Sequence, residues 1–212
     1  MALELQCRKV GMTQIFNDSG ECIPVTVLEA GPNTVVQKKT GEKEGYDSLQ
    51  IGYGDRRPSR TSKAAAGHFQ KAGVAPKQTL RESRVTAEEG AQYEVGQLVD
   101  TGIFSEGQHV DVVGISKGRG TAGVVKRHNF KVKRRTHGTH EAHRHAGSIG
   151  AGAWPGRVIK GMKMPGRYGN AQVSALNQEI VRIDSERSLL FIRGAVPGHR
   201  NAIVCVRPSV KG

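Results

Sequence analysis

Hydrophobic and polar positions alternate over short runs of this chain, and Gly, Pro, Asn or Asp residues separate the runs. Runs of this length, rich in Val, Ile and Thr, are typical of β-strands. They predict strands over residues 8–16, 22–29, 34–39, 48–53, 80–85, 97–100, 109–115, 178–184, 189–196 and 202–206. The run 63–72 instead has three alanines and is followed by Gly73 and Pro76, which predicts a short helix. The pattern therefore predicts a mostly β protein, with turns spaced as in a small barrel.

The predicted strands fall into two blocks, 1–116 and 171–212, and the segment between them lacks this alternation. Neither block has enough strands to bury both faces of a sheet, so we expect the two blocks to share one core. The strands over 178–184 and 189–196 flank a Ser-Glu-Arg-Ser turn and should form a hairpin. The first strands should follow one another as a meander. The predicted architecture is a small β-barrel domain with a long basic, Gly-rich extension, 117–170, inserted between its strands.

Charge sets the segment 117–170 apart from the rest of the chain. It holds thirteen Lys or Arg residues against one acid, Glu141, while the other 158 residues carry 19 basic and 18 acidic side chains. Eleven glycines and only six Val or Ile residues accompany those charges. Such a segment cannot bury enough apolar surface to offset the entropy of ordering its backbone. We therefore expect it to order against a polyanion, and the net charge of +13 favours a nucleic acid, with RNA as the first candidate.

Membrane and secretory locations are not favoured. No apolar run approaches the roughly 20 residues of a membrane-spanning helix, and no apolar secretory segment precedes the first predicted strand. The three cysteines, Cys7, Cys22 and Cys205, are widely spaced in apolar runs, which predicts buried free thiols in a reducing compartment. We therefore expect a cytoplasmic protein without a membrane partner.

Two motifs in the basic segment suggest other chemistry and are kept as alternatives. Residues 118–123 match the dinucleotide pattern G-x-G-x-x-G, but the basic, His-rich residues that follow do not predict the second parallel strand of such a fold. The spacing of His137, His140, His143 and His145 could suit zinc, yet no cysteine lies nearby in the sequence and arginines surround them. No nucleophile–base pattern is recognisable. We expect no enzyme activity, cofactor, metal or small-molecule substrate.

Two basic arms and a tip of small residues make up the candidate RNA-binding surface. Lys, Arg and His occupy seven of the ten positions 126–135, with Phe130 among them, which suits contacts along an RNA backbone. A second basic run, 157–167, follows the Gly- and Ala-rich tip 147–156, where Trp154 has little core to join and is expected to stack on a base. The predicted RNA-binding residues are Lys117, Arg119, Lys126, Arg127, His128, Phe130, Lys131, Lys133, Arg134, Arg135, His137, His140, His143, Arg144, His145, Trp154, Arg157, Lys160, Lys163 and Arg167.

Several longer motifs follow one another along nearly the whole chain: KVGMTQIF, IPVTVLEAGPN, GHFQKAGVAP, VDVVGISKGRGTAGVVKRHNF, GSIG, PGRVIKGMKMPGRYGN and LLFIRGAVPG. In this number and order they resemble the large-subunit ribosomal protein three family, in its bacterial form. The resemblance implies a structural protein of the large ribosomal subunit that binds large-subunit rRNA near its 3′ end and nucleates early assembly. It also implies that neighbouring ribosomal proteins contact the barrel and that the extension runs toward the peptidyl transferase centre.

The resemblance further assigns parts to the extension. Residues 117–126 would be its base, 127–144 one arm, 151–154 the tip and 157–167 the returning arm. Some bacterial relatives carry a methylated glutamine just after GSIG, where this chain has Ala-Gly-Ala at 151–153, so that modification is not carried over. A free-standing RNA chaperone or nucleic-acid-compacting protein, built on the same basic arm, is the alternative function.

Overall fold

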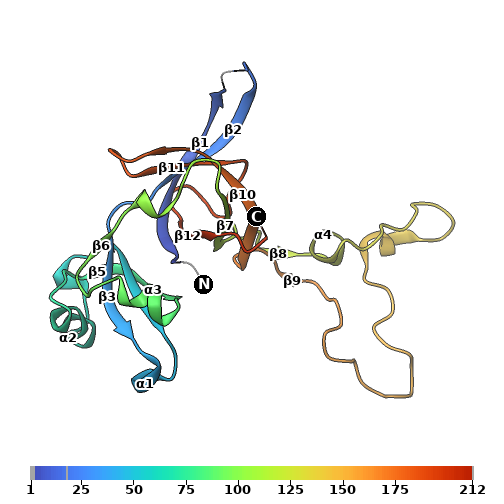
Figure 1. Cartoon of the computed structure of the whole chain (residues 1–212). Coiled ribbons are helices and arrows are strands. Elements are labelled where there is room, and N and C mark those ends of the chain that lie inside the picture. Colours follow the sequence, from blue (N-terminus) through green and yellow to red (C-terminus); the bar gives the residue numbers. More distant parts are fainter. Residues whose placement is uncertain (1–2, 18, 212) are drawn as a thin grey trace. The chain divides into compact units, whose positions relative to one another are not determined.

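The computed structural model describes residues 3–17 and 19–211 and is mostly β, which confirms the predicted class (Figure 1). The chain divides into two compact units. One unit, here called the globular unit, contains the residues up to Ile115 and those from Gln172 onward. The other, Ser116–Ala171, is called the basic unit.

The first sheet of the globular unit closes on itself as a six-stranded barrel. Its strands are β1 (Leu5–Phe16), β2 (Cys22–Glu29), β7 (His109–Ile115), β10 (Gln172–Asp184), β11 (Leu189–Arg193) and β12 (Ile203–Pro208). Their order is β1-β12-β7-β10-β11-β2, with β2 pairing back onto β1, and each pairing is antiparallel. Because the ring is closed, its strands leave no free edge. The predicted hairpin is confirmed as β10 and β11.

The second sheet has four strands in the order β5-β4-β3-β6. They are β3 (Asn33–Lys39), β4 (Ser48–Asp55), β5 (Lys77–Arg84) and β6 (Leu98–Val99). The predicted meander is therefore wrong, because the chain leaves the ring after β2 and starts another sheet. The buried side chain of Asn33 fixes this change of direction: its Nδ2 donates to the carbonyls of Ala30 (3.2 Å), Gly31 (3.1 Å) and Gln6 (3.0 Å).

Short helices lie between the strands of the second sheet, and one more lies between β6 and β7 of the ring. They are α1 (Gly41–Glu44), the 3-10 helix η1 (Pro58–Arg60), α2 (Lys63–Lys71), α3 (Ala87–Ala91) and the 3-10 helix η2 (Thr101–Ile103). The predicted helix at 63–72 is confirmed as α2. Helix α3 was not predicted, although Thr86 and Glu89 form a capping box whose T-x-x-E pattern is visible in the sequence.

Both sheets contribute to one hydrophobic core, and both sequence blocks supply residues to it. Leu28, Ile180 and Leu190 come from the ring, and Leu49 and Ile51 come from β4; all five are at most 1% exposed. Burial of these large aliphatic side chains is the main favourable contribution to the stability of the globular unit.

The cysteine prediction is correct for two of the three residues. Cys7 and Cys205 are buried free thiols on the adjacent strands β1 and β12, and burial raises the pKa of both, that of Cys205 to about 11. Cys22 is exposed, so the prediction is wrong there. The reason is its position: Cys22 is the first residue of β2 and pairs with Phe16, which is itself 64% exposed.

Candidate nucleic-acid interface

The basic unit begins and ends in a short antiparallel ladder. Its strands β8 (Thr121–Ala122) and β9 (Gly166–Arg167) pair in the register Thr121↔Arg167 and Ala122↔Gly166. Backbone hydrogen bonds extend the ladder on one side: Arg119 N donates to Tyr168 O (2.8 Å), Tyr168 N to Gly120 O (2.9 Å), and Ser116 N to Ala171 O (2.9 Å). We call this ladder, 116–122 with 166–171, the root.

Glycine is required at one position of the root. Gly169 has a φ of +72°, and a Cβ there would lie 2.2 Å from Lys117 O and 3.1 Å from Arg119 N. Both contacts are with backbone atoms, so a side chain could be accommodated only by separating the two strands. The close pairing of the root therefore depends on the glycine content of the PGRYGN motif.

A short helix, α4 (Val124–His128), follows β8 and ties the outgoing chain to the returning chain. The Arg127 guanidinium donates to Met164 O (2.8 Å), and His128 Nε2 lies 3.1 Å from the same oxygen. Asn129 ends the helix in the left-handed conformation, at φ 58°. Arg127 and His128 are consequently half-buried and already hydrogen-bonded, unlike most of the other predicted site residues.

The segment 129–165 contains little regular structure. Within the described residues it has one helical stretch, the 3-10 helix η3 (His140–Arg144), and apart from short turns the hydrogen bond from Lys133 N to His143 O (3.1 Å) is its backbone link between distant positions. Every side chain from 151 to 165 is exposed. Trp154 is 86% exposed, so the expectation that it has no core to join is confirmed; base stacking by Trp154 stays a prediction.

Most of the predicted RNA-binding residues are accessible. Sixteen of the twenty are exposed, and the other four, Arg127, His128, Phe130 and His143, are half-buried. In the part of the chain that the structure describes, none of the thirteen Lys and Arg residues of 117–170 forms an ion pair. Their positive charge is therefore uncompensated by the chain itself and is presented to solvent.

The structure gives no support to the two alternative sites. Among residues 3–17 and 19–211, no three His, Cys, Asp or Glu side chains come together as metal ligands. The strand before the G-x-G-x-x-G match, β7, pairs with β10 and β12, and both pairings are antiparallel. A dinucleotide fold needs a parallel βαβ unit at this position, so the nucleotide interpretation is wrong. No helix in the described range combines the length and the apolarity needed to cross a membrane.

Sequence reasoning missed one candidate residue, Tyr168. The Arg119 guanidinium lies over the Tyr168 ring, 5.0 Å from its centroid, in a cation–π contact. This contact holds Arg119 over the root while the side chain remains exposed. An aromatic residue between Arg167 and Gly169, in a basic, Gly-rich run, was the available signal in the sequence.

In comparisons with known proteins, the family model and the relatives all point to one protein family. The model of a family described as Ribosomal protein L3 matches residues 87–190, a range that includes the whole basic unit. The large ribosomal subunit protein uL3 of Acidithiobacillus ferrooxidans is 51% identical over 212 residues, covering 100% of both chains. The protein of the same name from Thiobacillus denitrificans is 49% identical over 212 residues, covering 100% of this chain and 99% of its own. That from Alkaliphilus metalliredigens is 49% identical over 207 residues, covering 98% and 97%.

Proposed function

Because this chain belongs to the family of the large ribosomal subunit protein uL3, we propose that it binds large-subunit rRNA directly through the basic unit. Membership makes it a structural constituent of the large ribosomal subunit, not an enzyme, and accounts for the expected location on cytoplasmic ribosomes. The rRNA contact itself, the residues that make it and the neighbouring ribosomal proteins belong to the proposal.

The uncompensated charge of the basic unit is the observation that carries the proposal. Thirteen cationic side chains accompany one acid and form no ion pair among the described residues. Cations that neutralise RNA phosphates release condensed counterions, and this release supplies binding free energy that falls as salt rises. Eleven glycines keep the segment narrow, which lets its backbone pass close to RNA helices.

The family resemblance supplies the finer parts of the proposal. The rRNA target lies near the 3′ end of the large-subunit RNA, binding nucleates early assembly, and the tip around Trp154 is directed toward the peptidyl transferase centre. The globular unit then contacts neighbouring ribosomal proteins.

Substitutions that replace Lys or Arg with uncharged Gln in the full chain test the rRNA contact. The arm variant combines Lys131→Gln, Lys133→Gln, Arg134→Gln and Arg135→Gln, all exposed side chains without an ion pair in the described structure. The matched control combines Lys43→Gln, Arg182→Gln, Arg187→Gln and Arg200→Gln on the globular unit, and it removes the same net charge from exposed positions.

Binding to a 3′-terminal large-subunit rRNA fragment is measured across a range of salt. We expect the arm variant to bind more weakly, and the slope of log K against log salt to fall in magnitude by about 3, because each lost phosphate contact removes roughly 0.7–0.9. The control should keep the wild-type slope to within about 1. Equal slopes for the arm variant and the control would contradict the proposal.

The alternative function, a free-standing RNA chaperone, can be distinguished from a structural role by how firmly the protein stays bound to large subunits. A structural constituent remains with large subunits through a high-salt wash, whereas a loosely held chaperone is released. Complete release of the intact chain at moderate salt would favour the chaperone.

A further inference from the structure

The globular unit has a charge asymmetry of its own, at the chain between β4 and β5. Residues 56–77 contain six Lys or Arg side chains and no acid. Outside this stretch and outside 117–170, the chain carries thirteen basic and eighteen acidic residues. The near-neutral charge of the globular unit therefore conceals a basic region on a mildly acidic remainder.

Four cations of this region are close together in the sequence and are free to bind a partner. Arg56, Arg57, Arg60 and Lys63 lie in and beside η1, all four are exposed, and none forms an ion pair within the described ranges. The acid just before them in the chain, Asp55, is paired with Lys77 at 2.9 Å. We call the four side chains the η1 cluster.

The backbone that carries the η1 cluster is well held. Arg56 N donates to Pro76 O (2.9 Å), and Arg60 N donates to Arg57 O (3.0 Å) within the turn. The Ser62 side chain then accepts from Ala65 N (3.4 Å) and caps α2. Such a fixed backbone lowers the ordering entropy that a partner must overcome on binding.

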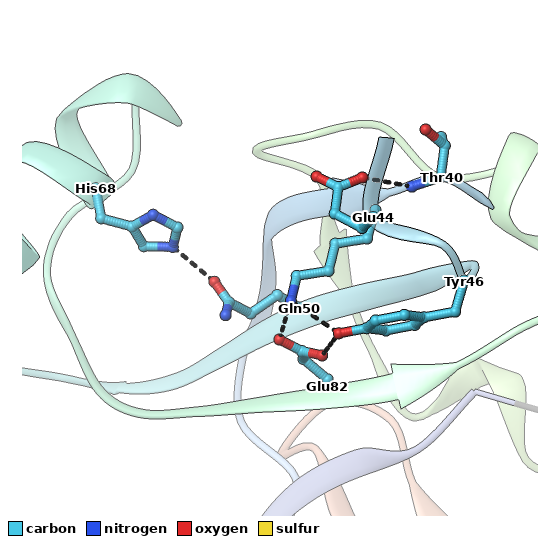
Figure 2. Close-up of polar contacts among 7 residues, drawn as sticks. Thr40, Glu44, Tyr46, Gln50, His68 and Glu82 are labelled. Carbon is cyan, nitrogen blue, oxygen red and sulfur yellow. Dashed lines mark hydrogen bonds and ion pairs between the residues drawn. The ribbon is translucent and has the colours of Figure 1, made fainter. Parts of the chain in front are cut away.

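Helix α2, which follows the cluster, is in turn fixed to the second sheet. Phe69 is 3% exposed, and His68 Nε2 lies 2.6 Å from Gln50 Oε1 on β4 (Figure 2). Beside Gln50 in the same view, Glu82 accepts hydrogen bonds from Tyr46 (2.8 Å) and from Lys39 (2.6 Å). These hydrogen bonds link α2 to β4 and β3 to β5, and Gln50 and Glu82 are paired positions of β4 and β5. The chain that carries the η1 cluster is therefore followed by a helix that is fixed to a packed sheet.

The chemistry of the cluster favours an RNA backbone over an acidic protein. Three of its four cations are arginines, whose planar guanidinium groups bind phosphate in a bidentate manner. Protein interfaces usually add a buried aromatic or aliphatic side chain at their centre. None of the exposed large hydrophobic side chains in the described structure lies within 56–77. The region thus has phosphate-binding groups without the apolar centre of a protein interface.

We propose that the η1 cluster is a second RNA-backbone contact, carried by the globular unit and independent of the basic unit. The proposal rests on the rRNA binding proposed above. It gives the protein two separate points of attachment to phosphate.

The test uses the full chain with Arg56→Gln, Arg57→Gln, Arg60→Gln and Lys63→Gln, called the cluster variant. It is compared with the arm variant and with the control at Lys43, Arg182, Arg187 and Arg200, since all three remove four positive charges. With the 3′-terminal rRNA fragment, the cluster variant should lower the magnitude of the salt slope by about 3, as each phosphate contact contributes roughly 0.7–0.9. A slope equal to that of the control would overturn the proposal.

Hydroxyl-radical footprinting on the same complexes tests independence. The cluster variant should lose protection of one set of nucleotides and keep the set that the arm variant loses. Loss of the same nucleotides by both variants would overturn the second contact. If the cluster variant changes the footprint and the arm variant does not, the further inference stands and the role proposed for the basic unit fails.

Discussion

The two units of this protein use charge in opposite ways. In the globular unit, outside the η1 cluster, several cations are paired with acids of the chain, as in Arg8–Glu29, Lys39–Glu82 and Lys77–Asp55, and the unit has a core of fully buried aliphatic side chains. In the basic unit, Ala122 and Val124 are the buried hydrophobic side chains of the described residues, and no cation there has an acidic partner.

The comparison separates two sources of order. Burial of apolar surface can specify the globular unit without a partner. The basic unit has the root and α4 as local structure, but in the described part of the chain 129–165 has neither a core nor an ion pair. We therefore expect an external anion to supply the missing free energy of ordering.

Amide hydrogen exchange on the free protein should show the largest contrast. We expect amides in 131–163 to exchange almost without protection, and those of β7 and β12 to be protected by a factor on the order of 10³ or more, set by global unfolding. Root amides such as Arg119 N should fall between the two. Strong protection across 131–163 without RNA would break the comparison.

Side-chain truncation should separate stability from binding. Leu28→Ala removes a fully buried side chain and should lower the free energy of unfolding by about 2–5 kcal/mol in urea denaturation. Trp154→Ala should change that free energy by less than about 0.5 kcal/mol, because the ring is exposed. Its rRNA affinity should instead fall by about 1–3 kcal/mol if the ring stacks on a base. A comparable loss of stability in both variants would contradict the distinction.

The effect of replacing a glycine of the root should depend on which glycine is replaced. Gly169→Ala places a Cβ against two backbone atoms at a φ of +72°, and we expect a local cost of about 1–3 kcal/mol, seen as faster exchange of the Arg119 and Tyr168 amides. Gly120→Ala is the matched control, since it has a similar φ of +66° with nothing within 4 Å of the added Cβ. Equal effects of the two variants would remove the steric explanation.

The smallest effect is expected from pH, in the polar network of the globular unit. A hydrogen bond from Lys39, and then one from Tyr46, lowers the pKa of Glu82 below its ordinary value of 4.5. A carboxyl with a lowered pKa in the folded state contributes stability that is present above pH 4.5 and is lost as pH falls through the folded pKa. In urea denaturation, the free energy of unfolding of the wild type should therefore be higher than that of Glu82→Gln at pH 7. The difference between the two free energies should shrink under acid conditions. A difference that does not vary with pH would contradict this assignment.

Local sequence patterns predicted much of the fold. The bounds of β2 and β7 match the expected strands, because runs such as CIPVTVLE and HVDVVGI are dense in β-branched residues. Strand β10 begins at Gln172, six residues before the prediction. The added residues are held by pairing with β7, which their own composition does not reveal. The change of sheet at Asn33 was missed for the same reason, since it depends on Gln6, distant in sequence.

The candidate site was predictable wherever charge defines it. A count of Lys, Arg and acids marks 117–170, and the same count within the neutral remainder marks 56–63. The pairing of 116–122 with 166–171 was not predictable, because the close approach of Gly169 to Lys117 joins positions 52 residues apart. Neither could the sequence show that Arg127 and His128 are already bonded to Met164.

The position of β12 in the ring determines when the barrel can be completed during synthesis. β12 lies between β1 and β7, so both of those strands keep an unpaired edge until Ile203–Pro208 has been made. Chains emerge from the ribosome with their N-terminal part first. The basic segment 117–170 is consequently available to RNA while the barrel is still an open sheet. An early encounter with rRNA would therefore involve a nascent protein whose ring has not yet closed.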